Sequence, residues 1–138
     1  MKLITVSLFL CFAVLGASTG CGQNKSSGRI AVVVVDLQPA EFMKAIEGGN
    51  LVLLDVRTPE EYNGGFIAGA RNLDYFGSGF EKELLAFDKE KPVYVYCASG
   101  GRSEAAAEDL IKNGLKQVYN LAGGIEAWRT QQLPVIQP

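Results

Sequence analysis

The stretch PVYVYCASGGRSEAAAEDLIKN, at residues 92–113, contains the change from strand to helix on which the fold prediction rests. Its first six residues are apolar, β-branched or aromatic, which favours a buried strand that ends at Cys97. Residues 102–113 have high helix propensity, and Gly114 follows them, as is typical of a helix end. Only small residues lie between the two elements. Cys97 is therefore predicted at the carboxyl end of a strand, beside a tight loop.

The same alternation of strands and helices extends to both sides of this stretch. Further strands are predicted at 30–36, 51–56, 70–73 and 118–121, and further helices at 59–62, 80–87, 125–132 and from residue 39 to the glycines at 48–49. The run IAVVVVD at 30–36 is continuous and β-branched, which predicts a strand buried on both faces. This order of elements predicts an α/β domain with a mainly parallel central sheet flanked by helices.

The composition excludes several kinds of chemistry. The chain has 138 residues, 48% of them hydrophobic and 20% charged, which favours one folded domain over a disordered chain. Its net charge is −2 and its basic residues are dispersed, so binding to nucleic acid gains no support. The chain has no histidine, which excludes Ser–His–Asp and Cys–His catalysis and any metal site that needs an imidazole. We expect a monomer without metal or cofactor.

The first 20 residues have the layout of a secretory signal peptide. Met1 and Lys2 precede an apolar run at 3–17, followed by small residues. This run is shorter than the roughly 20 residues that cross a bilayer, so a membrane-spanning helix is the second choice. The segment STGC at 18–21 resembles the lipobox of bacterial lipoproteins, with Ser18 where leucine is usual. We expect an exported protein of the bacterial cell envelope or periplasm, lipid-anchored at Cys21; ordinary cleavage to a soluble protein is the alternative.

The remaining chain divides into a polar, flexible tether at 21–29 and a domain at 30–138. Cys97 is the only cysteine in that domain and has no disulfide partner there, which makes it a candidate reactive thiol. Small loop residues can turn successive N–H groups inward to hold an anion, and a helix N-terminus with Arg102 adds positive charge. These features predict a Cys97 pKa below the ordinary value of about 8.5. The alternative is a merely buried cysteine before a glycine turn.

Four segments, taken together and in order, resemble the motifs of the rhodanese homology domain. They are LLDVRTPEEY at 53–62, GFIAGARN at 65–72, CASGGRS at 97–103 and LAGGIEAW at 121–128. Phe66 stands where many members of that family carry histidine. The resemblance implies a rhodanese-like fold, with Cys97 at the base of a cradle-shaped loop.

The resemblance also implies a function, that of a thiosulfate sulfurtransferase. The Cys97 thiolate would take sulfane sulfur from a donor such as thiosulfate, and the persulfide would pass it to cyanide or a thiol acceptor. In this family the loop backbone holds the outer sulfur, and an arginine shapes the loop and binds the anion. The corresponding substrate-binding residues here are Ala98, Ser99, Gly100, Gly101 and Arg102, with Asp55, Arg57 and Ser103 as supporting residues. For Asp55 and Arg57, a structural ion pair that braces the turn after the strand is an equally good interpretation.

Other functions stay open at this point. A phosphatase uses a similar loop, but with five residues between cysteine and arginine, whereas four separate Cys97 from Arg102. A non-catalytic binding module is a second alternative, although this chain keeps both residues. A thioredoxin-like redox cycle would need a resolving cysteine, which the domain lacks. Trp128 is predicted to pack in the core, and Gly123 and Gly124 to form a tight turn before the last helix.

Overall fold

The computed structural model describes residues 33–138. The predicted signal peptide, the tether and Cys21 lie outside these residues, as does the start of the strand predicted at 30–36. Among residues 33–138, none of the helices has the length and apolar character needed to cross a membrane.

A five-stranded sheet forms the centre of the domain, and every strand pair in it is parallel. The strands are β1 (Val35–Leu37), β2 (Val52–Asp55), β3 (Arg71–Asn72), β4 (Val93–Tyr96) and β5 (Val118–Leu121), in the spatial order β1-β5-β4-β2-β3. All four residues of β4 are buried, as its apolar sequence predicts. The α/β class with a parallel sheet is therefore confirmed.

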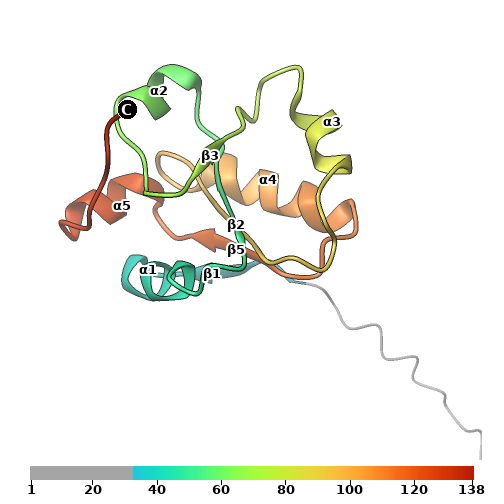
Figure 1. Cartoon of the computed structure of the whole chain (residues 1–138), viewed down its shortest axis with the longest axis horizontal. Coiled ribbons are helices and arrows are strands. Elements are labelled where there is room, and N and C mark those ends of the chain that lie inside the picture. Colours follow the sequence, from blue (N-terminus) through green and yellow to red (C-terminus); the bar gives the residue numbers. More distant parts are fainter. Residues whose placement is uncertain (1–32) are drawn as a thin grey trace, which may run out of the picture.

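Helices cover both faces of the sheet (Figure 1). They are α1 (Pro39–Ile46), α2 (Pro59–Asn63), α3 (Phe80–Leu85), α4 (Gly101–Lys112) and α5 (Gly124–Thr130). Side chains of α3 and α4 pack with Val93 and Val95 in one core, and side chains of α1 and α5 pack with Tyr94 and Tyr96 in the other. Alternate residues of β4 thus face opposite layers, as a strand requires. Trp128 is 1% exposed and lies in the second core, which confirms the prediction for it.

The prediction that the first strand is buried on both faces is wrong. Among the described residues, β1 has three residues and pairs only with β5, so it forms an edge of the sheet. Val33 and Val35 are 65% and 44% exposed. A run of β-branched residues favours an extended segment, but it does not show whether that segment lies at the buried centre of a sheet or at its more exposed edge.

Local signals fix where several helices begin. In α2, the Thr58 hydroxyl accepts a hydrogen bond from the Glu61 N–H, and the Glu61 carboxylate accepts one from the Thr58 N–H. This reciprocal capping box follows directly from the spacing of the two residues. In α4, Gly100 precedes the helix with a φ of +112°, a conformation that favours glycine. After α5 the chain returns to the segment that follows α2, where Ile136 and Phe66 exchange backbone hydrogen bonds.

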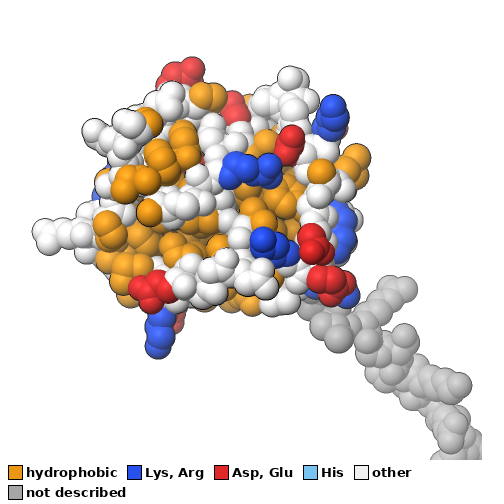
Figure 2. Space-filling model, viewed as in Figure 1, with side chains coloured by type: hydrophobic (Ala, Val, Ile, Leu, Met, Phe, Trp, Pro, Cys, Tyr) orange, Lys and Arg blue, Asp and Glu red, His pale blue; other side chains and the backbone are white. Residues whose placement is uncertain are grey.

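On the face drawn in Figure 2, Lys and Arg side chains are scattered among Asp and Glu, and apolar side chains gather over α1 and α5.

Candidate active site

Cys97 lies where several loops meet, at the carboxyl ends of the central strands. Cys97 directly follows β4 and is 1% exposed. The register pairs Asp55 at the end of β2 with Tyr96 at the end of β4, so the segments after both strands emerge side by side. In open parallel sheets the carboxyl ends of the strands are the usual place for a ligand site.

The loop after Cys97 turns hydrogen-bond donors toward its sulfur. The Gly100 N–H donates to Sγ at 3.1 Å, and the hydroxyl of the fully buried Ser103 lies 3.5 Å from Sγ. Burial raises the pKa of Cys97, but hydrogen bonds from the Ser103 hydroxyl and from the N–H groups of Ser103, Gly100 and Ser99 lower it by more. The Cys97 pKa is therefore below its usual value. Of the N–H groups predicted to face inward, that of Gly100 thus donates to the sulfur.

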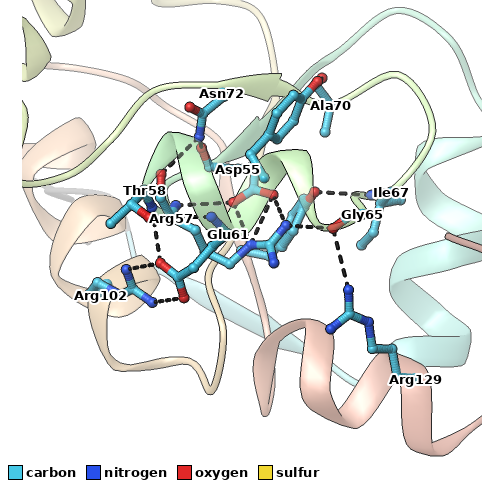
Figure 3. Close-up of polar contacts among 12 residues, drawn as sticks. Asp55, Arg57, Thr58, Glu61, Gly65, Ile67, Ala70, Asn72, Arg102 and Arg129 are labelled. Carbon is cyan, nitrogen blue, oxygen red and sulfur yellow. Dashed lines mark hydrogen bonds and ion pairs between the residues drawn. The ribbon is translucent and has the colours of Figure 1, made fainter. Parts of the chain in front are cut away.

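Arg102 does not point freely into the site. Its two terminal nitrogens bind both carboxylate oxygens of Glu61, at 2.7 and 2.8 Å (Figure 3). The hydrogen bond from Arg102 is the main reason why the Glu61 pKa falls from 4.5 to about 2. In return, Glu61 raises the pKa of Arg102, to which the charges of Cys97 and Asp74 also contribute. Arg102 thus ties the start of α4 to α2, and its charge is largely neutralised before any anion binds.

Asp55 and Arg57 form a buried ion pair, as Figure 3 shows. The guanidinium donates to both carboxylate oxygens, with a shortest distance of 2.6 Å, and to the Gly65 carbonyl at 2.9 Å. Burial alone would lower the Arg57 pKa, but the hydrogen bond and charge of Asp55 raise it above the usual value. Asn72 donates to the carbonyls of both residues. These contacts brace the turn between β2 and α2, and their hydrogen bonds do not reach Cys97.

Two residues at this site lie outside the set that the sequence predicted for it. Glu61 was recognisable as a helix-capping residue from its spacing to Thr58, but its partner Arg102 lies 41 residues away. Gly124, predicted only as part of a turn, packs against the backbone of Cys97 and Ala98. No local pattern indicates either contact, because both depend on how β2, β4 and β5 are ordered in the sheet.

A surface cavity of about 420 Å³ lies away from this site. Leu51, Arg71, Phe87 and Lys91 line it, near the starting ends of β2, β3 and β4, and Cys97 does not. Arg71 is paired there with Glu83, and Tyr75 lies within hydrogen-bond distance of Asp109. The chemistry of the Cys97 loop, rather than the size of a cavity, therefore defines the candidate site.

The chain belongs to the rhodanese-like domain family, whose model matches residues 38–131. This match covers most of the described structure, including Cys97 and its loop. The fold is accordingly the α/β rhodanese fold, with a five-stranded parallel sheet flanked by helices.

Individual relatives agree with this assignment. The thiosulfate sulfurtransferase GlpE of Stutzerimonas stutzeri (strain A1501) is 35% identical over 91 residues, which are 66% of this chain and 82% of that protein. The uncharacterized protein YqhL of Bacillus subtilis (strain 168) is 45% identical over 76 residues, but the match covers only 55% of this chain and 59% of YqhL. A rhodanese-related protein from Thermoplasma volcanium has a TM-score of 0.67 at 31% identity, covering 75% of this chain and 99% of that one. The chain thus contains a single rhodanese-like domain related to the GlpE sulfurtransferases.

Proposed function

We propose that this protein is a sulfurtransferase that carries sulfane sulfur as a persulfide on Cys97. The best support comes from the contacts of the Cys97 sulfur, which accepts a hydrogen bond from the Gly100 N–H and lies beside the Ser103 hydroxyl. These donors favour the thiolate, which is the nucleophilic form of cysteine. The related GlpE proteins are named for thiosulfate as their substrate, and thiosulfate is the donor that we propose here.

The reaction has two displacement steps. The Cys97 thiolate attacks the outer sulfur of thiosulfate, a new S–S bond forms on Cys97, and the S–S bond of thiosulfate breaks as sulfite leaves with the electron pair. Cyanide, or the thiolate of an acceptor, then attacks the outer sulfur of the persulfide and regenerates the Cys97 thiolate. Cyanide leaves as thiocyanate. Each step conserves atoms and charge, and neither needs a histidine base or an external oxidant.

The loop backbone has the principal role in this mechanism. The Gly100 N–H faces Sγ from within the loop, so it is placed to stabilise negative charge on the Cys97 thiolate and on the persulfide that forms there. Arg102 serves mainly to hold the loop, because Glu61 already neutralises most of its charge. Ser99 and Gly101 are exposed, so the substrate approaches Cys97 from the outer side of this loop.

Intact-mass measurement tests the proposal. The reduced protein is treated with thiosulfate, then with cyanide, beside a Cys97→Ser variant. We expect a gain of one sulfur atom that cyanide removes and that the variant does not show; the variant also controls for the cysteines near the N-terminus. Absence of the gain in folded, reduced protein, with thiosulfate or a low-molecular-weight persulfide as donor, would refute the proposal. Phosphatase substrates would then be the next to test.

We also propose export and lipid anchoring at Cys21, which the lipobox-like segment at 18–21 supports. Expressed in a bacterium, the full chain should fractionate with membranes and carry the mass of acyl groups at its N-terminus. Cys21→Ser should move it to the soluble fraction. Recovery of the unmodified protein in the cytoplasm would refute this proposal.

A further inference from the structure

The first turn of α5 holds the backbone of the Cys97 loop. The Ile125 N–H donates to the Cys97 carbonyl at 2.9 Å, and the Glu126 N–H donates to the Ala98 carbonyl at 3.0 Å. This contact arises because β4 and β5 are neighbours in the sheet, so the segments that leave their carboxyl ends meet. N–H groups in the first turn of a helix have no partner within the helix and are free to bind such carbonyls.

Gly124 makes this close approach possible. A Cβ atom at this position would lie 2.6 Å from the Cys97 carbonyl oxygen and closer still to the Ala98 carbonyl. Ordinary van der Waals contacts are longer than 3.4 Å, so any side chain would push α5 away from the loop. The φ of +59° at Gly124 also favours glycine, but other residues can adopt it, so the close approach of α5 to the loop is the stronger reason for a glycine here.

The carbonyl contacts determine where the loop N–H groups point. In a trans peptide the C=O of one residue and the N–H of the next point in opposite directions. The Ala98 carbonyl is bound to α5, so the Ser99 N–H is turned to the other side of that peptide. The Gly100 N–H, the next donor along the loop, reaches the Cys97 sulfur at 3.1 Å.

We infer that Gly124 is a positioning residue for Cys97: it allows the first turn of α5 to bind the carbonyls of Cys97 and Ala98, and so holds the loop in the conformation in which the Gly100 N–H donates to the sulfur. This inference deepens the proposed function, since it concerns the same site. Gly124 acts only through the loop backbone and need not touch the substrate.

The test compares Gly124→Ala with Gly49→Ala, a variant of a glycine that also has a positive φ. Gly49 has a φ of +75°, and a methyl group there would meet only open space, so Gly49→Ala reports backbone strain alone. Each protein's Cys97 pKa is measured from the pH dependence of alkylation by iodoacetamide, with the modified peptide identified by mass spectrometry.

We expect Gly124→Ala to raise the Cys97 pKa by about one unit, which reduces the thiolate fraction about tenfold at pH values below the pKa. Gly49→Ala should leave the Cys97 pKa unchanged, even where it lowers the melting temperature. An unchanged Cys97 pKa in folded Gly124→Ala would overturn the inference. A rise of the same size in Gly49→Ala would overturn it too.

A second pair of variants removes one hydrogen bond without inserting a side chain between α5 and the loop. Glu126 is exposed, and Glu126→Pro deletes its N–H in the first helical turn, whereas Glu126→Ala keeps it. We expect a raised Cys97 pKa only in the proline variant, and equal values would overturn the inference even if Gly124→Ala fails to fold. Alkylation needs no sulfur donor, so this result is independent of whether thiosulfate forms a persulfide on the wild-type protein.

Discussion

The hydroxyl of Ser103 provides the sharpest test of how this site stabilises a thiolate. Ser103 is fully buried, and its Oγ lies 3.5 Å from Cys97 Sγ and 2.9 Å from the Gly100 carbonyl oxygen. One hydroxyl hydrogen serves these two acceptors, and the carbonyl is the nearer. Ser103→Ala removes this donor and leaves the neighbouring backbone N–H groups in place.

The size of the effect follows from these distances. A hydrogen bond to a charged group contributes about 1.5–3 kcal/mol, and sharing the hydrogen with Gly100 reduces this to roughly 1 kcal/mol. That corresponds to a rise of about 0.7 unit in the Cys97 pKa, or about a fivefold loss of thiolate at pH values below the pKa. The wild-type Cys97 pKa lies below the ordinary value, so the rise moves it toward that value.

The assay is the pH dependence of Cys97 alkylation, followed by the rate of sulfur transfer from thiosulfate at a fixed pH. Ser99→Ala is the matched control: Ser99 is an exposed serine of the same loop, and the substitution keeps its backbone N–H. We expect the control to match the wild type in its Cys97 pKa. If folded Ser103→Ala keeps the wild-type Cys97 pKa, the backbone alone stabilises the thiolate, and the role assigned here to the hydroxyl is refuted.

Three further predictions concern the charged residues around the loop. Glu61→Gln removes the negative charge that pairs with Arg102 and should lower the free energy of unfolding at pH 7. The loss should be only about 1 kcal/mol, because both side chains of the pair are partly exposed. A loss below the error of urea titration would contradict this. Since the Glu61 pKa is lowered from 4.5 to about 2 in the folded state, its contribution is full above pH 4.5 and is lost as the pH falls toward 2. The difference in stability between wild type and Glu61→Gln, measured by urea titration at several pH values, should therefore close over that range, and a gap that stays constant would contradict the assignment. Asp55→Ala should lower the free energy of unfolding by about 3–5 kcal/mol, because it leaves the buried Arg57 without a counter-charge. The double variant Asp55→Leu with Arg57→Met should recover part of that loss in the same titration.

Several features of this protein follow from its sequence because they depend on residues close together in the chain. The apolar run before Cys97, the small residues after it and the helix-forming segment that follows predict the strand, loop and helix observed as β4 and α4. Thr58 and Glu61 are three residues apart, so the capping box of α2 is also visible in the sequence. The pattern of strand, loop and helix predicted the position of Cys97, and the alternation of such elements predicted the α/β class, since secondary structure and its ends are governed largely by local sterics and local hydrogen bonds.

The tertiary structure decided the features that depend on which strands are neighbours. The strand predicted as buried became the exposed edge strand β1, because β5 alone pairs with it among the described strands. Arg102 binds Glu61 and is not left unpaired, because β2 and β4 are parallel neighbours and their carboxyl ends lie side by side. Gly124 contacts the Cys97 loop because β5 lies on the other side of β4. The spacing of residues along the chain does not indicate which strands are neighbours. The order of the strands is determined only when the whole apolar surface of the sheet is buried between its two layers of helices.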